Sequence, residues 1–339
     1  MIGKISAVGV ALLALAAAPA LDAATTPEAD FAARCAAPGV TKCVAFDNTT
    51  TDIVRNVNLV PDGNGTFRGG LDTTIKASGI GSLRFDLPPP PHAGANIAGA
   101  WLPQTNDGLG SLFGQNSVFY VQFRQRFSPE MLKQTWDSYY KTVLFHYNQI
   151  SCGSLEITTI NYYLTNRPTM YTDCGAQLVT TMLDGSTYTS NTPLLMQQGD
   201  YHCQYGQESP ATCFYLVANE WLTFYYRIQV GTYNQANSHI DAWVAREGDT
   251  AFKQWIHVTN YTIGCDTDPC TSAPGKDQGF NNLTFTPYMT ALSTTSGLAG
   301  VTSHVWYDEL IVSTQPIALP GAPATPADTL APAAPTGLR

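Results

Sequence analysis

The chain has 339 residues and a formal net charge of −9, and only 13% of its residues are charged. A chain this acidic and this poor in lysine is not expected to bind nucleic acid, because such binding depends on lysine and arginine contacts with phosphates. A polyanion could bind only through a local basic groove that acts against the overall field.

Residues 1–23 have the features of a secretory signal peptide. Lys4 precedes an apolar run from Ile5 to Ala18, and small residues follow it. The run is too short to cross a bilayer, and no later segment is long and apolar enough to do so. We therefore expect a secreted or periplasmic monomer without a membrane partner.

The eight cysteines favour disulfides over a metal site, because their number is even in an exported chain and no Cys-x-x-Cys pair occurs. The sequence leaves their connectivity open. Spacing between neighbours suggests the pairs Cys35–Cys43, Cys152–Cys174, Cys203–Cys213 and Cys265–Cys270.

Residues 30–315 are expected to form a single all-β domain, either a β-jelly roll or a two-sheet antiparallel sandwich. Many short alternating segments separated by turn residues are typical of that class. Strands are expected at 44–46, 82–87, 118–127, 141–146, 155–163, 220–233, 239–247, 283–285 and 305–313. The Gly-rich and Asn-rich segment 94–114 is expected to be a loop, and a short helix should follow Ser128.

Two segments are expected to lack regular structure. Residues 175–219 form a long irregular insertion, and insertions of this length in a compact domain usually act as lids or groove walls. Residues 316–339 are rich in proline and alanine and are expected to be a linker.

A structural calcium ion is one further expectation, although no cofactor is required. Asp47 follows an early strand and Asp308 lies in a late one, a pattern found where β-sandwiches bind calcium. Calcium needs several oxygen ligands, and turn formation is the other interpretation of these aspartates.

The strand at 118–127, VFYVQFRQRF, alternates strictly between apolar and polar side chains. Its polar face presents Tyr120, Gln122, Arg124 and Arg126, with alternate residues about 7 Å apart along the strand. Guanidinium groups match carboxylates in two-point fashion, so this row could form the floor of a groove for an acidic polymer. A solvated face is the alternative.

Two later strands present similar side chains, with Tyr233 at the end of one of them. If the three strands are neighbours in one concave sheet, their polar side chains converge on one groove. The additional substrate-binding candidates are Lys141, Tyr225, Arg227, Gln229 and Trp243, and His146 ends the strand that begins with Lys141.

The order of these motifs resembles the concanavalin A-like polysaccharide lyases that degrade alginate and related uronic-acid polymers. Those enzymes carry an Arg-rich strand, then a strand with Gln and His, then a strand ending in Tyr-x-Gln. The matching positions are Gln122/Arg124/Arg126, His146 with Gln149 nearby, and GTYNQ at 231–235. The Arg-rich motif here lacks the family's glutamate, the Gln-x-His triplet is absent, and Gln229 replaces the usual lysine.

The resemblance implies cleavage of a uronic-acid polymer by β-elimination. Arg124 with Gln122 would neutralise the substrate carboxylate, His146 would act as the base, and Tyr233 would act as the acid or as a combined acid and base.

Two other functions stay open. A carbohydrate-binding module or lectin would need only aromatic platforms and hydrogen-bonding side chains. A glycoside hydrolase would need two carboxylates about 5–10 Å apart, but Asp241 with Glu247 and Asp308 with Glu309 are poorly spaced for that role.

Overall fold

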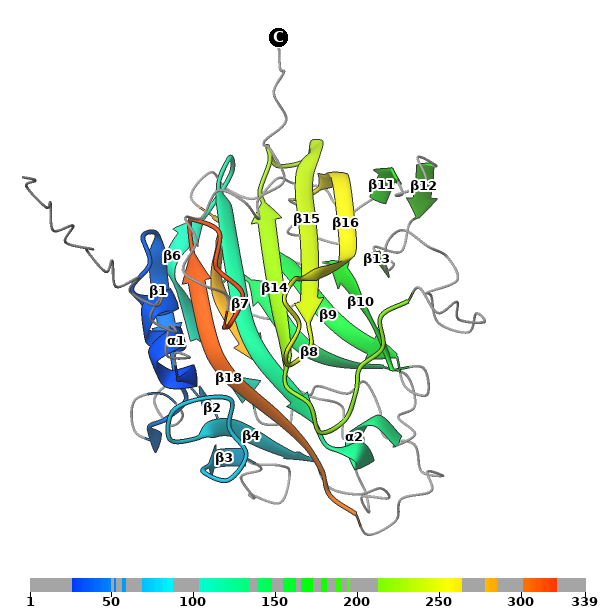
Figure 1. Cartoon of the computed structure of the whole chain (residues 1–339). Coiled ribbons are helices and arrows are strands. Elements are labelled where there is room, and N and C mark those ends of the chain that lie inside the picture. Colours follow the sequence, from blue (N-terminus) through cyan, green and yellow to red (C-terminus); the bar gives the residue numbers. More distant parts are fainter. Residues whose placement is uncertain are drawn as a thin grey trace, which may run out of the picture.

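The structure is a computed structural model of the whole chain (Figure 1). It describes residues 26–49, 52, 57–58, 69–87, 104–105, 107–133, 139–147, 155–162, 166–172, 178–181, 187–190, 194–195, 213–263, 278–285 and 301–321.

The larger of two facing sheets has ten strands. Their spatial order is β12-β11-β16-β15-β14-β7-β18-β4-β3, and β1 pairs with the C-terminal part of β18. These strands are β1 (Val40–Val44), β3 (Gly69–Asp72), β4 (Ser82–Leu87), β7 (Val118–Phe127), β11 (Leu178–Thr181), β12 (Thr187–Ser190), β14 (Leu222–Gln229), β15 (Ala236–Ala245), β16 (Lys253–Thr262) and β18 (Ser303–Ser313).

The second sheet has six strands in the order β13-β10-β9-β8-β17-β6. They are β6 (Asp107–Phe113), β8 (Tyr139–His146), β9 (Glu156–Tyr162), β10 (Arg167–Thr172), β13 (Leu194–Leu195) and β17 (Phe280–Phe285). A separate pair is formed by β2 (Val57–Asn58) and β5 (Gln104–Thr105).

The core lies between the two sheets, where the inner faces pack against each other. From β7, the apolar members of the alternating pattern, Phe119, Val121, Phe123 and Phe127, are fully buried there. The ring of Phe123 meets that of Phe285 from the opposite sheet at a centroid distance of 4.8 Å. The period of two therefore places the apolar side of β7 inside the sandwich, as expected.

The predicted two-sheet antiparallel sandwich of the jelly-roll class is confirmed, and the named strand pairs are antiparallel (Figure 1). The short helix after Ser128 is α2 (Pro129–Lys133), and the Ser128 hydroxyl accepts from the Met131 amide at 3.2 Å. The loop prediction for 94–114 was wrong at its end. There β6 pairs with β17 and buries Leu109 and Phe113, so tertiary pairing overrides the weak strand preference of glycine.

Helix α1 (Pro27–Cys35) was not expected from the sequence, and it covers part of the outer face of the ten-stranded sheet. Its N-terminal signals are nevertheless present, because Thr26 caps it and Pro27 opens its first turn. Phe31 of α1 packs with Tyr225, Ile311 and Ile317. The first residues after β18 run over the same face, where the Gln122 side-chain amide donates to the Ala318 carbonyl at 2.9 Å.

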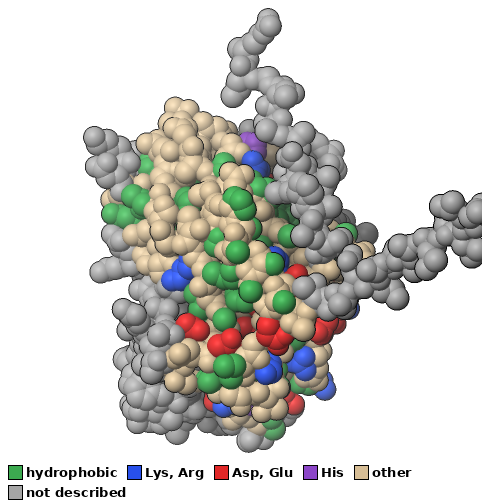
Figure 2. Space-filling view, turned by 60° about the vertical axis from the view of Figure 1, so that its left-hand side comes forward, with side chains coloured by type: hydrophobic (Ala, Val, Ile, Leu, Met, Phe, Trp, Pro, Cys, Tyr) green, Lys and Arg blue, Asp and Glu red, His purple; other side chains and the backbone are tan. Residues whose placement is uncertain are grey.

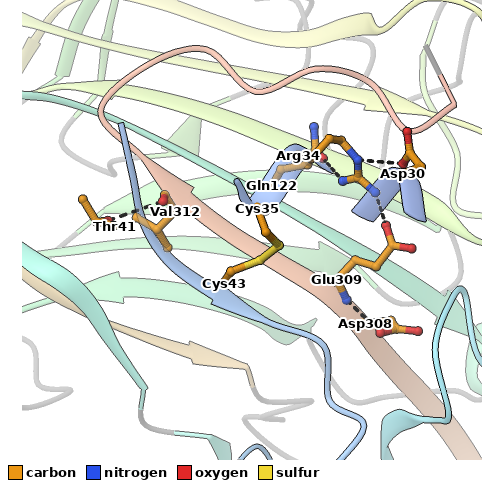
Figure 3. The surroundings of a disulfide bond; sticks show 9 residues. All are labelled: Asp30, Arg34, Cys35, Thr41, Cys43, Gln122, Asp308, Glu309 and Val312. Carbon is orange, nitrogen blue, oxygen red and sulfur yellow. Dashed lines mark hydrogen bonds and ion pairs between the residues drawn. A yellow bond between two sulfur atoms is a disulfide. The ribbon is translucent and has the colours of Figure 1, made fainter. Parts of the chain in front are cut away.

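Arg34 attaches α1 to the sheet (Figure 3). Its guanidinium contacts Asp30 at 2.8 Å, the Gln122 side-chain oxygen at 2.7 Å and Glu309 at 2.5 Å. Arg34 and Glu309 are both almost completely buried. One buried cation therefore joins helix α1 to strands β7 and β18.

The predicted disulfide Cys35–Cys43 is present and joins the end of α1 to β1 (Figure 3). Cys213 is also disulfide-bonded. Its predicted partner Cys203 and the predicted pairs Cys152–Cys174 and Cys265–Cys270 lie outside the described residues.

We expect the double variant Cys35→Ser/Cys43→Ser to unfold more easily in urea than the parent. The cysteines are eight positions apart, and closing a loop of this size in the unfolded chain is worth about 2–3 kcal/mol. A change below about 1 kcal/mol would show that the docking of α1 by Arg34 suffices without the disulfide.

Among the described residues the two α-helices have nine and five residues, and neither could serve as a membrane span. The predicted signal peptide at 1–23 lies outside the described residues, as does the predicted linker apart from its first residues, 316–321. The insertion at 175–219 was expected to lack regular structure, and this was wrong for its described residues. Among them, β11 and β12 extend the ten-stranded sheet, and β13 pairs with β10 in the other sheet.

Candidate functional site

The polar residues expected to share one groove lie on the outer faces of the two different sheets. The outer face of the ten-stranded sheet carries the β7 row (Tyr120, Gln122, Arg124, Arg126), the β14 row (Tyr225, Arg227, Gln229) and Trp243. The outer face of the six-stranded sheet carries Lys141 and His146. Packed sheets are about 10 Å apart, so the prediction of a single groove is corrected.

Both polar side-chain atoms of Gln122 already have partners in the protein. It is fully buried under α1 and the segment after β18, its side-chain oxygen accepts from Arg34, and its nitrogen donates to Ala318. The expected pairing of Gln122 with Arg124 on a substrate carboxylate is therefore not available in this structure.

Arg124 lines a pocket of 390 Å³ between β7, α1 and the segment from Leu319 to Gly321. Its guanidinium lies 3.8 Å from Glu247 and 3.8 Å from Glu309, and over the ring of Trp221. The pocket wall contains four carboxylates and two guanidiniums, from Asp30, Glu247, Asp249, Glu309, Arg124 and Arg246. This excess of negative charge opposes the binding of a polyanion.

The other substrate-binding candidates on this sheet are largely engaged with one another. Tyr225 stacks on Tyr120 at 6.1 Å and lies against the tilted ring of Trp243 at 5.4 Å, and its hydroxyl accepts from the Ile317 amide. Arg227 donates to Asp241 at 3.0 Å and to Gln229 at 2.8 Å. Arg126 lies opposite Trp306 in the pairing of β7 with β18.

Lys141 and His146 share one outer face because of a β-bulge. They are five positions apart, and strict alternation would put them on opposite faces of β8. The register shifts between Lys141 and Val143, which inserts one residue into the pattern. Val143 and Phe145 therefore point into the core, while Lys141 and His146 point out of it.

Neighbouring strands complete a polar cluster around these two residues. The Lys141 ammonium contacts Glu156 at 3.2 Å, and the Thr158 hydroxyl donates to the same carboxylate at 2.7 Å. His146 pairs across the strands with Glu156 on one side and Asn282 on the other. Its Nε2 lies 2.9 Å from the Thr284 hydroxyl.

Burial keeps His146 neutral. The side chain is completely buried, and desolvation lowers its pKa to about 4, against a smaller opposite effect of Glu156. Its Nδ1 has no hydrogen-bond partner in the structure, and the Thr169 hydroxyl on the same face has none either. Buried polar atoms of native proteins are usually bonded, so such exceptions need an explanation.

Among the described side chains of β8, β9, β10 and β17 that point outward, the charged residue types are Lys141, Arg167 and Glu156, two basic and one acidic. Sequence analysis missed Glu156, Thr158, Asn282 and Thr284. The alternation of LEITTINYY contained the signal for the first two, because it places them on the side opposite the core residues.

Tyr233 lies just beyond the end of β14, largely buried. Its hydroxyl donates to the Gln278 carbonyl at 2.6 Å. Burial raises its pKa to about 12, with a further contribution from Tyr147, the residue after His146. The phenol therefore holds its proton at neutral pH, and its catalytic role stays a prediction.

The two aspartates expected to bind calcium hold the loop that precedes β4. Asp47 accepts from the Ile80 and Gly81 amides, and Asp308 accepts from the Ala77 amide at 2.8 Å. Burial raises the pKa of Asp308. Amide donors occupy oxygens that a cation would need, and no group of three metal-ligating side chains occurs among the described residues. Calcium binding stays a prediction that these contacts do not favour.

Comparison with known proteins finds similar solved structures at low sequence identity. The alginate lyase from Aplysia kurodai has a TM-score of 0.49 at 9% identity over 80% of this chain and 98% of its own. The endo-β-1,4-glucuronan lyase from the fungus Trichoderma reesei has a TM-score of 0.43 at 12% identity, covering 73% and 87% of the two chains. The alginate lyase Aly36B has a TM-score of 0.44 at 13% identity, covering 82% and 98%.

No family model and no curated protein matches the sequence. At identities of 9–13% these structural similarities assign no family to the chain.

Proposed function

We propose that this protein is an exported polysaccharide lyase that cleaves a uronic-acid polymer by β-elimination on the outer face of the six-stranded sheet. The observation that carries the proposal is a neutral, buried His146 whose Nδ1 has no partner, on the same face as the Lys141 ammonium.

The chemistry requires a base, a cation and an acid. In the tautomer with the proton on Nε2, His146 donates to Thr284 and keeps a lone pair on Nδ1. Nδ1 would take the proton from the carbon atom that bears the substrate carboxylate. The electrons of that C–H bond would form the carbon–carbon double bond, and the glycosidic C–O bond would break.

Lys141 would stabilise the substrate carboxylate as negative charge develops beside it. Its ammonium has three donors, and Glu156 uses at least one of them. Tyr233 stays the predicted acid for the leaving oxygen, but it packs among the core residues and its hydroxyl donates to the Gln278 carbonyl. It would have to leave that position to deliver its proton on this face.

The charges of the two outer faces favour the outer face of the six-stranded sheet over the pocket beside Arg124 as the site of elimination. Carboxylates outnumber guanidiniums around Arg124, whereas Lys141 and Arg167 outnumber Glu156 on the opposite face. Because the side chains of this face are buried, a polymer can bind only after the face opens.

A glycoside hydrolase is less well supported, because the strand carboxylates already have structural partners. Asp241 accepts from Arg227, Gln254 and His257, and Asp308 accepts from backbone amides. A general acid would need one carboxyl group free to hold a proton beside the glycosidic oxygen.

The test is the ultraviolet absorbance of the conjugated double bond that elimination leaves, measured with purified protein and a panel of uronic-acid polysaccharides. We expect absorbance to rise with the parent and to be lost in Lys141→Met. Because this change leaves Glu156 buried without its cation, the double variant Lys141→Met/Glu156→Gln should be measured beside it. Lys253→Met, an exposed lysine on β16, is the matched control and should be active.

The outcomes separate the competing functions. No absorbance with retained polymer binding would overturn the lyase and leave a binding module. New reducing ends without absorbance would indicate hydrolysis instead.

The pH dependence tests the state of His146. Since burial lowers its pKa to about 4, the base form persists throughout the neutral range, and kcat/KM should decline only as the pH falls through about 4. Glu156 and Lys141, which face it, shift this value in opposite directions. A decline centred near pH 6.5, the value of an exposed histidine, would show that His146 is not the base in this environment.

A further inference from the structure

The pocket beside Arg124 takes no part in the proposed elimination, yet it has the features of a binding site. It lies on the other side of the sandwich, and its wall includes Thr223, Glu247, Glu309 and the segment from Leu319 to Gly321. The Gly321 amide donates to Asp30 at 3.0 Å, and Leu319 is buried, which fixes that part of the wall. In Figure 2, which brings the α1 side forward, acidic side chains gather across the middle of the molecule.

Arg124 is the unusual member of this pocket. Its side chain is nine-tenths buried, yet its terminal nitrogens approach Glu247 and Glu309 only to 3.8 Å, and its Nε is buried without a partner. Hydrogen bonds of N–H groups to oxygen are about 2.7–3.2 Å long. Within the described part of the chain the guanidinium therefore forms ion pairs but no hydrogen bond, although it has five N–H donors to satisfy.

The carboxylates next to Arg124 also accept no hydrogen bond from it. One oxygen of Glu309 accepts from Arg34, and the other oxygen lies 3.8 Å from Arg124. Glu247 is exposed and contacts Arg124 at the same distance. Donors and acceptors thus surround a gap that is too wide for direct hydrogen bonds.

The charges limit what could occupy this gap. Four carboxylates oppose an anion, and no group of three side chains that could hold a metal ion occurs among the described residues. A hydroxyl group suits both sides, because its oxygen accepts from Arg124 while its hydrogen is donated to a glutamate. Two neighbouring hydroxyls would serve Glu247 and Glu309 at once.

We propose that this pocket binds a neutral saccharide, whose vicinal hydroxyls bridge Arg124 to Glu247 and Glu309. The protein would then hold a neutral glycan on the outer face of the ten-stranded sheet and act on an acidic polymer on the outer face of the six-stranded sheet. The two sites share no residue, so binding at the Arg124 pocket does not depend on the proposed elimination.

Isothermal titration calorimetry of the purified full chain with cellotetraose and mannotetraose tests the proposal. We expect saturable binding of at least one of these neutral probes. Arg124→Met should weaken it about tenfold or more, because a charge-assisted hydrogen bond is lost. Glu247→Ala should weaken it similarly, and this exposed residue can be changed without disturbing the core.

The control is Lys141→Met/Glu156→Gln, which alters the other face and should leave binding of the neutral probe unchanged. Absence of saturable binding with both probes would overturn the proposal, as would equal affinities in the parent, Arg124→Met and Glu247→Ala. A uronate trisaccharide that binds the parent but not Arg124→Met would also overturn it, because the pocket would then select an anion.

Discussion

His146→Gln is expected to lower kcat for elimination about 10²–10⁴-fold, the usual contribution of a positioned general base. The glutamine side chain keeps a polar group near Thr284 but offers no basic nitrogen at the position of Nδ1. Because His146 is neutral in its buried setting, the change removes no buried charge from this face. The measurement is the initial rate of absorbance increase at saturating polymer.

Thr284→Val separates the base from its surroundings. This variant removes only the hydroxyl that fixes the imidazole tautomer, so it should reduce kcat less than His146→Gln does. A His146→Gln protein that is folded, by its thermal unfolding curve, and retains its parent rate would exclude His146 as the base.

Arg34→Met is expected to destabilise the fold by about 3–5 kcal/mol, the usual cost of breaking a buried ion pair. Glu309 would then keep only Arg124, which lies 3.8 Å away and forms no hydrogen bond with it. Arg34 is the hydrogen-bonding partner of the almost fully buried Glu309, and the same guanidinium donates to Gln122. Removing it should release α1 from β7 and β18. Urea unfolding of the parent and the variant, with equal slopes, measures the difference.

Two controls identify the source of this effect. Arg34→Met/Glu309→Gln removes both charges and should recover a substantial part of the loss, since no buried carboxylate is then left without a hydrogen-bonding cation. Asp30→Asn affects a partly exposed partner on the same helix and should cost less. A loss below about 1 kcal/mol in Arg34→Met would mean that α1 is held by apolar packing around Phe31 instead.

Local sequence determined the elements and the inner faces of the strands. The alternation of Phe119, Val121 and Phe123 with polar neighbours specified a half-buried strand, and these side chains do form the core. Ser128 followed by proline specified α2, and the short spacing of Cys35 and Cys43 indicated their disulfide. These properties depend on residues close together in the chain, so the sequence alone reveals them.

Tertiary structure decided which outer faces are available and which polar residues meet. Alternation assigns Gln122 to the outside of its strand, but it cannot show that α1 and residues 314–321 cover that side. Nor can it assign β8 to the opposite sheet from β7, because strand pairing joins segments far apart in sequence. The bulge at Lys141 then places this residue on one face with His146, where strict alternation predicts opposite faces. The sequence by itself thus determined the two faces of each strand, while long-range packing decided which of them could become a site.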